Sequence, residues 1–153
     1  MSGKEGPGFE KIMVAFDTSK DSVTAVDFGC SLAKKYGSTL IVVHVYSITS
    51  PTYSGVAQTP VPDYEGIAEL SKERARGILT EGIELAEAHG VKAEGELLEA
   101  SSTVQALVEF AESEKVDLII VGTRGMTGFK KLVLGSVSNG LVSHSVCPVL
   151  VVR

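Results

Sequence analysis

Three glycines and a serine stand at fixed positions before a short helix-forming segment. Residues 116–121 (VDLIIV) form an apolar run that leads into Gly122 and Gly125, and after nine further residues Gly135 and Ser136 precede the segment VSNGLVSH. Glycine permits positive φ and lets a ligand approach the backbone closely. The first N–H groups of a helix carry partial positive charge and favour anions. The spacing therefore predicts an anion site, with Ser136 as the N-cap whose hydroxyl serves the helix or a phosphate oxygen.

An acid ends the first apolar run of the chain. Asp17 closes residues 11–17 (KIMVAFD), and Thr18 and Ser19 follow it. If both runs are parallel strands, Asp17 and the glycine segment lie at one sheet edge, where a carboxylate accepts hydrogen bonds from ribose hydroxyls. The alternative is that Asp17 caps a helix and the glycines are plain turn residues. Convergence of both features on one edge favours a ligand site.

Other chemistries have less support in the sequence. The phosphate-binding pattern GxxxxGK[ST] and the dinucleotide pattern GxGxxG are absent. No two histidines are close enough in sequence to suggest a metal site. We interpret His44, within an apolar run, as a core residue, and His89 and His144 as residues near helix C-termini. The serines lack a nucleophile elbow, and Cys147 is expected to be buried and inert.

Alternating strand and helix patterns must position these residues. Buried β-branched runs predict strands, and apolar residues three and four apart predict helices. The expected order is a strand at 11–17, a helix at 21–36 stopped by Gly37, a strand at 39–46, a helix at 65–88, an edge strand at 91–98, a helix after Ser101 or Ser102, a strand at 116–121, a helix at 137–144 and a strand at 147–153. This alternation predicts an α/β fold with a doubly wound parallel sheet, whose ligands bind at the carboxyl ends of strands.

Length and composition limit the class of protein. A chain of 153 residues has room for one domain, which we expect to span residues 1–153. Residues 47–64, rich in proline, serine and threonine, predict a long mobile loop, and residues 1–9 are expected to be flexible. No apolar run approaches the roughly 18 residues of a membrane helix, and the polar N-terminus is unlike a secretory signal. With only two cysteines and no disulfide framework, we expect a cytoplasmic protein.

The charge is negative overall but unevenly spread. The net charge of −5 argues against a nucleic-acid binder, which normally shows a dominant basic stripe. Residues 116–153 differ, because Asp117 is their only acid whereas Arg124, Lys130 and Lys131 fall among the glycines. Basic residues in a glycine-rich stretch suit a small anionic ligand, although surface bases for solubility explain them equally well.

The pattern Gly122-x2-Gly125-x9-Gly135-Ser136, followed by Val137-Ser138 and ending in CPVLVV, resembles that of the universal stress protein family. The segments KIMVAFDTSKDSVTAVDFGCSLA and LIVVHVY resemble its first strand and helix and its second strand, so the resemblance covers residues 10–153. It implies a five-stranded parallel sheet in the order 3-2-1-4-5 and a homodimer formed through the last strand, residues 147–152. The branch of the family that carries these glycines binds ATP.

The resemblance also implies a role for each site residue. Asp17 would hold the ribose. Three residues, Ala15, Phe16 and Val45, would line the adenine and sugar pocket. Val121, Gly122, Arg124 and Gly125 would surround the base, the sugar and the first phosphates, and Gly135, Ser136, Val137 and Ser138 would face the phosphate chain. Any Mg²⁺ would be held mainly by the phosphates.

The resemblance implies an ATP-binding regulator of the stress response, a homodimer whose nucleotide occupancy changes its shape or its choice of a protein partner. AMP and ADP remain alternatives to ATP. We find no general base and no paired acids for a catalytic metal, so efficient ATP hydrolysis is not expected, although slow hydrolysis or self-phosphorylation stays open. The rival hypothesis is a dimeric interaction module that binds no nucleotide. A nucleotide-hydrolysing enzyme of the wider superfamily is weaker, because Asp17-Thr18-Ser19 stands where ATP pyrophosphatases carry Ser-Gly-Gly.

Overall fold

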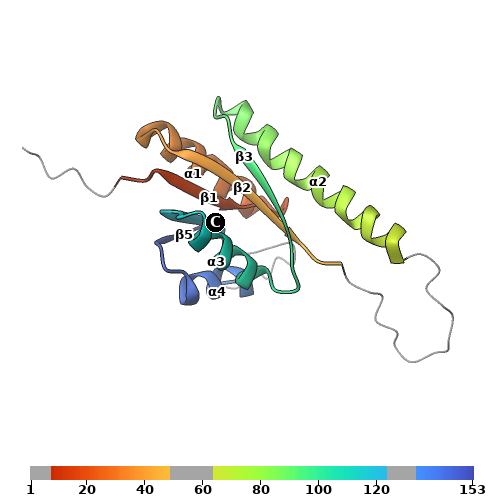
Figure 1. Ribbon diagram of the computed structural model, residues 1–153. Helices are drawn as coiled ribbons and strands as arrows, with labels where there is room; N and C mark the ends of the chain where they lie inside the picture. Colours follow the sequence, from red (N-terminus) through yellow and green to blue (C-terminus); the bar gives the residue numbers. More distant parts are fainter. Residues whose placement is uncertain (1–7, 49–63, 124–133) are drawn as a thin grey trace, which may run out of the picture.

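Strands and helices alternate throughout the part of the chain that the computed structural model describes, residues 8–48, 64–123 and 134–153 (Figure 1). The elements are β1 (Lys11–Ala15), α1 (Lys20–Tyr36), β2 (Thr39–Tyr46), α2 (Tyr64–Ala88), β3 (Glu94–Glu99), α3 (Thr103–Ser113), β4 (Leu118–Gly122), α4 (Ser136–His144) and β5 (Val149–Val152). The segments 1–7 and 49–63, which contain most of the expected flexible N-terminus and mobile loop, lie outside the described residues.

The strands form one five-stranded sheet in the order β3-β2-β1-β4-β5, and every neighbouring pair is parallel. In the register, Val14 lies opposite Val42 of β2 and opposite Ile120 of β4. The predicted α/β class and strand order are therefore confirmed. Strand order reverses between β1 and β4, so the crevice outside their carboxyl ends is where a doubly wound sheet binds its ligands.

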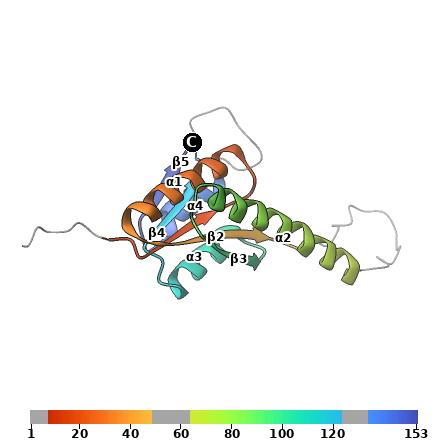
Figure 2. The same ribbon diagram turned by 90° about the horizontal axis from the view of Figure 1, so that it is seen from above.

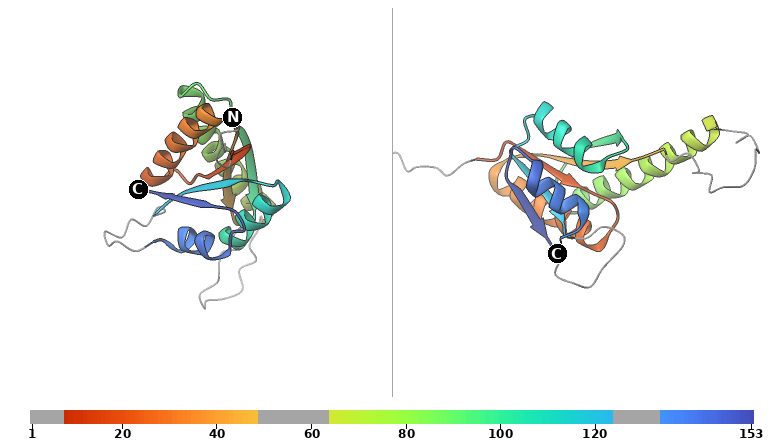
Figure 3. Two further views of the ribbon diagram at one scale, coloured as in Figure 1. Left: turned by 90° about the vertical axis from the view of Figure 1, so that its left-hand side faces the viewer. Right: turned by 90° about the horizontal axis from the view of Figure 1, so that it is seen from below.

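Alternating side chains divide the core between the two faces of the sheet. On one face, Val14, Val42 and Ile120 pack with Val26 of α1 and Ala86 of α2. The other face buries a second set, Met13, Val43, Ile119, Leu107 of α3 and Leu141 of α4. The left view of Figure 3 shows α1 and α4 on opposite sides of β4 and β5. The central strands are buried on both faces, as their continuous apolar sequences predict.

Local interactions explain where the element bounds differ from those predicted. Gly37 ends α1 with a φ of 67°, as expected. Gly90 also has a positive φ, and the N–H of Val91 donates to Ala86 O at 3.0 Å. Both residues therefore belong to the C-terminal cap of α2, and β3 begins at Glu94 instead of residue 91. Similarly, the Cys147 N–H bonds to Ser145 Oγ in a turn, and β5 begins only at Val149.

The two edge strands differ in how they are covered. On the β3 side, α2 packs on the face formed by β2 and β3, and its N-terminal end runs past both strands (Figure 2). Glu94, Glu96 and Glu99 place charge along β3, a usual protection for an open edge. By contrast, β5 carries only valine and leucine. No helix in the described segments has the length and apolar character needed to cross a membrane.

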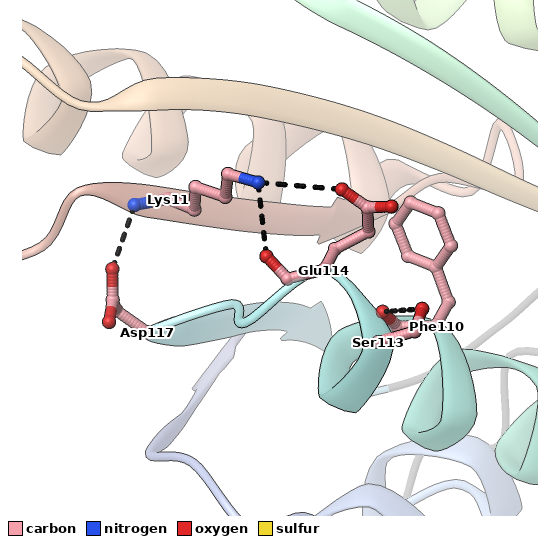
Figure 4. Close-up of polar contacts among 5 residues, drawn as sticks. All are labelled: Lys11, Phe110, Ser113, Glu114 and Asp117. Atoms are coloured by element: carbon pink, nitrogen blue, oxygen red, sulfur yellow. Dashed lines mark hydrogen bonds and ion pairs between the residues drawn. The ribbon is translucent and has the colours of Figure 1, made fainter.

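At the amino-terminal ends of the strands, residues after α3 and before β4 bind the start of β1 (Figure 4). Asp117 Oδ2 accepts hydrogen bonds from the N–H groups of Glu10 and Lys11, at 2.8 and 2.9 Å. Lys11 Nζ donates to the carbonyl oxygen of Glu114 at 3.1 Å and lies 3.4 Å from its carboxylate. Asp117 therefore has a structural role at the end of the sheet opposite the crevice.

Candidate functional site

A pocket of about 220 Å³ opens at the carboxyl ends of β1, β2 and β4, between the N-termini of α1, α3 and α4. It contains the predicted site residues Ala15, Phe16, Asp17, Val45, Val121, Gly122, Gly135, Ser136, Val137 and Ser138. The other two, Arg124 and Gly125, lie outside the described residues, as do Lys130 and Lys131. The fold thus brings together residues that are more than a hundred positions apart in sequence.

Asp17 forms part of a tight turn between β1 and α1. Its Oδ1 accepts a hydrogen bond from the Ser19 N–H at 3.0 Å, and its own N–H donates to Ser22 Oγ at 3.3 Å. Between Asp17 and Ser19, Thr18 has a φ of 69°, a conformation that costs a non-glycine residue free energy and that an aspartate turn helps to stabilise. The N-cap of α1 is Ser19, which accepts from Ser22 N. Asp17 is therefore half-buried in the pocket with one oxygen bonded inside the turn.

The N-terminus of α4 faces the pocket through Gly135, Ser136, Val137 and Ser138. The prediction that Ser136 caps this helix is wrong, because the N-cap is Gly135, which has no side chain to form a cap hydrogen bond. Ser138 makes the stabilising contact instead: its Oγ lies 3.1 Å from the carbonyl oxygens of Gly135 and Thr123. Its hydroxyl proton is thus directed at carbonyl groups. The main-chain N–H groups of the first turn are what this helix offers to an anion.

Gly122 is required by close packing between the end of β4 and α1. A Cβ at Gly122 would lie 2.6 Å from Asp21 Cβ, 2.9 Å from the Asp21 carbonyl carbon and 3.1 Å from Ser22 N. The first turn of α1 therefore packs directly on the end of β4. The positive φ given above as a reason for the glycines does not apply to Gly122, whose φ is not positive. Gly135 also has a negative φ, of −62°.

One wall of the pocket is apolar. Ala15, Val43, Val45, Leu107 and Val121 line it and belong to the core on the α3 and α4 side. Such a wall suits a planar, weakly polar group such as a nucleobase.

Phe16 has a different place, because its side chain belongs to the core on the α1 and α2 side. A Cβ on Gly82 of α2 would lie 2.8 Å from the ring. Only 2% of Phe16 is exposed, so it offers little surface to a ligand.

Several pocket residues were not predicted from the sequence: Ser19, Ser22, Val43, His44, Thr103, Leu107 and Thr123. His44 is the core histidine that its apolar context indicates, because its Nδ1 lies 2.8 Å from the Phe16 carbonyl oxygen and must carry the proton. Thr103 and Leu107 come from α3. Their position follows from topology, since every helix of such a fold begins at the same edge of the sheet that carries Asp17.

The described lining residues include one acid, Asp17, and one histidine, His44. Across residues 8–48, 64–123 and 134–153, no three His, Cys, Asp or Glu side chains gather as a metal-binding group. The pocket offers instead a carboxylate, an apolar wall and a helix N-terminus.

Known proteins are similar to this chain over nearly its whole length. The profile of the universal stress protein family matches residues 8–153. Universal stress protein MJ0531 of Methanocaldococcus jannaschii is 35% identical over 145 residues, which cover 95% of this chain and 82% of that protein.

Two solved structures are also similar. A universal stress protein in complex with cAMP is 28% identical with a TM-score of 0.67, covering 96% of this chain and 98% of that one. The Archaeoglobus fulgidus universal stress protein in complex with dAMP shares the fold, with a TM-score of 0.70, 20% identity and coverage of 95% and 98%. The chain belongs to the universal stress protein family.

Proposed function

We propose that this protein binds an adenine nucleotide, ATP foremost and AMP or ADP as alternatives, in the pocket at the carboxyl ends of β1, β2 and β4. The observation that carries the proposal is the convergence in one pocket of the Asp17 carboxylate, an apolar wall and the N-terminus of α4. These three features match a ribose, a nucleobase and a phosphate chain respectively. The complexes of family members with cAMP and dAMP support the same ligand class.

Each part of the nucleotide has a proposed partner. The base lies against Ala15 and Val45, with Val121 on the same wall of the pocket, and Phe16 supports this wall from the opposite face of the sheet. Asp17 accepts hydrogen bonds from the ribose hydroxyls through the carboxylate oxygen that does not serve Ser19. The N–H groups of Ser136, Val137 and Ser138 face the phosphates, next to Gly135. Gly122, Arg124 and Gly125 complete the site as the family resemblance implies.

We further propose that nucleotide is bound rather than rapidly turned over. Among the described pocket residues, Asp17 is the only carboxylate, so the pair of acids that would fix a catalytic metal is not formed by them. Phosphoryl transfer relies on positioned metal ions and on a group that orients the nucleophile. Mg²⁺ would therefore be held by the phosphates of the nucleotide. Binding of the nucleotide, rather than its hydrolysis, would regulate the protein.

A regulatory role requires a surface that changes when nucleotide binds in the pocket. We propose that this surface is a homodimer interface along residues 147–152. The β5 edge is uncharged. Close to it in sequence, Val142 and Val146 are 51% and 76% exposed, large fractions for valine. Because β5 pairs with β4, whose end reaches the pocket, a dimer formed there would sense a ligand. Unpaired cysteines are consistent with a cytoplasmic setting.

The direct test is to purify the protein under native conditions and identify any retained nucleotide by mass spectrometry. Titration calorimetry of the nucleotide-free protein with ATP, ADP, AMP and GTP then ranks the ligands. We expect saturable binding of adenine nucleotides and weaker binding of GTP. A protein that releases no nucleotide and shows no heat with any of them would instead favour the interaction module that works without a nucleotide.

A further inference from the structure

Thr123, directly after β4, is connected to three other elements by four hydrogen bonds. Its N–H donates to Val152 O of β5 at 2.7 Å. Its carbonyl oxygen accepts from the Gly135 N–H at 2.7 Å and from Ser138 Oγ at 3.1 Å, both at the start of α4. Its Oγ1 donates to Asp21 Oδ2 of α1 at 2.6 Å. Thr123 therefore joins the ends of two strands to the beginnings of two helices.

The two bonds to the Thr123 carbonyl determine where α4 begins. Gly135 is the N-cap of α4, and Ser138 lies within its first turn. Both are held against the end of β4 by the same oxygen atom, so the direction of this carbonyl fixes the first turn of the helix. That turn supplies the N–H groups that line the pocket. A small rotation of the Thr123 backbone would therefore reorient these N–H groups.

The Thr123 side chain limits such a rotation because it is bonded to Asp21. Asp21 lies in the first turn of α1, where a negative charge is favoured by the helix dipole. This turn packs so closely on Gly122 that no Cβ fits between them, so the backbone of Asp21 has little freedom to move. Thr123 is only 9% exposed, and the bond of 2.6 Å is short, as expected for a hydroxyl that donates to a carboxylate.

We propose that Asp21 and Thr123 are positioning residues for the phosphate side of the pocket. The inference rests on the proposed function and names the pair that holds the α4 N-terminus in place. Thr123 acts through its carbonyl rather than by touching the ligand, because its hydroxyl proton already goes to Asp21. A phosphate can only accept hydrogen bonds, so it cannot bind to the Thr123 hydroxyl oxygen, whose proton is already donated to Asp21. Asp21 is not among the pocket-lining residues.

The test compares ATP with adenosine, which lacks phosphates, by calorimetry on the full chain. Thr123→Val keeps the shape of the side chain but removes the donor. We expect it to lower ATP affinity by about tenfold, the scale of one charge-assisted hydrogen bond, and to change adenosine affinity by less than about twofold. Thr123→Ser keeps the hydroxyl and should restore ATP affinity to within about threefold of the parent.

Asp21→Ala breaks the same bond from α1 without changing a pocket residue, so it provides an independent measurement if Thr123→Val folds poorly. It should show the same selective loss for ATP. In the variant that combines Asp21→Ala with Thr123→Val, the two losses should not add, because both changes remove the same hydrogen bond. Asp117→Asn, which weakens contacts at the opposite edge of the sheet, should lower the melting temperature and leave ATP affinity unchanged.

The outcomes separate this inference from the proposed function. A parent chain that binds neither ATP nor AMP overturns both. If the parent binds ATP, the inference alone is overturned by single variants that bind ATP as tightly as the parent, by equal losses for ATP and adenosine, or by a serine variant no better than valine. Additive losses in the combined variant would also contradict it, since the two residues would then act separately.

Discussion

The carboxylate of Asp17 accepts a hydrogen bond from the backbone N–H of Ser19, with 3.0 Å between Oδ1 and N. This bond stabilises the turn in which Thr18 has a φ of 69° and from which α1 begins. Asp17 therefore has a structural role in addition to the ribose contact that we propose for it. The two roles use different properties of the Asp17 carboxylate. The turn uses one oxygen as an acceptor, whereas the ribose hydroxyls use the second oxygen and the negative charge.

We expect Asp17→Asn to preserve the turn and to weaken ATP binding, since an amide oxygen can still accept from Ser19. Loss of a charged acceptor costs about 1.5–3 kcal/mol, which is about tenfold to a hundredfold in affinity. Calorimetry with ATP and 2′,3′-dideoxy-ATP makes the test specific to the sugar. The parent should prefer ATP by this factor, and the variant should lose the preference. A variant that still discriminates between the two ligands would restrict Asp17 to the turn.

A methyl group on Gly122 should destabilise the fold itself. In Gly122→Ala the new Cβ meets the backbone of Asp21 and Ser22, which cannot move away without shifting α1. Overpacking of this kind costs about 1–3 kcal/mol in the free energy of unfolding, measurable by urea denaturation. Gly77, in the interior of α2, is the matched control because a Cβ there would meet nothing within 4 Å. Gly77→Ala should stabilise the protein by about 0.5–1 kcal/mol. Equal stability of the Gly122 variant and the parent would contradict the packing argument.

Gly135→Val should affect the ligand rather than the fold. With a φ of −62°, Gly135 has a conformation open to other residues, so valine introduces bulk at the pocket without backbone strain. We expect calorimetry to show no ATP binding in a protein that still folds, with a melting temperature a few degrees lower because valine is a poorer N-cap than glycine. Leu134→Ala changes an exposed neighbour outside the pocket lining and should bind ATP normally. Normal ATP affinity in a folded Gly135 variant would contradict the position proposed for the phosphates.

The helices and strands whose bounds follow from their own residues could be predicted from the sequence. The bounds of β2 match the prediction, residues 39–46, because nearly all of its residues are β-branched or apolar and the strand is buried from Leu40 to His44. The stop at Gly37 likewise follows from glycine's access to positive φ. The start of β3 was misplaced because it depends on a hydrogen bond from Val91 back to Ala86 in the cap of α2. Apolar alternation alone carries no information about that bond.

The pocket residues that belong to a sequence motif could be predicted. Those that depend on contacts between distant parts of the chain could not. The glycine pattern and Asp17 predict the end of the sheet at which the pocket lies, because the carboxyl ends of the strands converge there in any doubly wound sheet. The cap assigned to Ser136 was wrong because Ser138 and the Thr123 carbonyl replace a side-chain cap. The bond between Thr123 and Asp21 joins residues 102 positions apart and had no local signal.

Stability should fall at alkaline pH through Cys30. Burial raises the pKa of this thiol above its ordinary value of 9.0, and the negative charge of Asp27 adds to the rise, while Lys34 opposes it. The folded state therefore keeps the proton at a pH where the unfolded chain has lost it. The unfolding free energy is unaffected below the unfolded pKa and decreases as pH rises through the folded pKa.

Urea titrations at several pH values above 9 should show this decrease in the parent, and a shallower one in Cys30→Ala, which lacks the thiol. A second measurement uses Cys147→Ser, in which Cys30 is the only thiol. Cys30 should react slowly with a thiol reagent at about pH 8 in the folded protein and rapidly in urea. Identical pH dependence in parent and Cys30→Ala would contradict the role of this thiol.

The geometry of β5 determines which of its backbone groups remain for a dimer. Ile119 N donates to Pro148 O, and Thr123 N donates to Val152 O, so these carbonyls face β4. Because successive residues of a strand point their backbone groups to opposite sides, the N–H and C=O groups of Val149 and Val151 face the open edge. They are the groups through which a second chain would pair.

We expect Val151→Pro to produce a monomer in light scattering at micromolar concentration, because proline lacks the outward N–H and its ring obstructs a paired strand. The hydrogen bonds between β4 and β5 should survive, since proline is tolerated in an edge strand where its nitrogen faces solvent. Glu99→Pro is the matched control at the other edge: Ala100 N donates to Tyr46 O, so the Glu99 N–H also points outward. It should leave the dimer intact. A parent that is itself monomeric, or a Val151 variant that remains a folded dimer, would place the interface elsewhere or remove it.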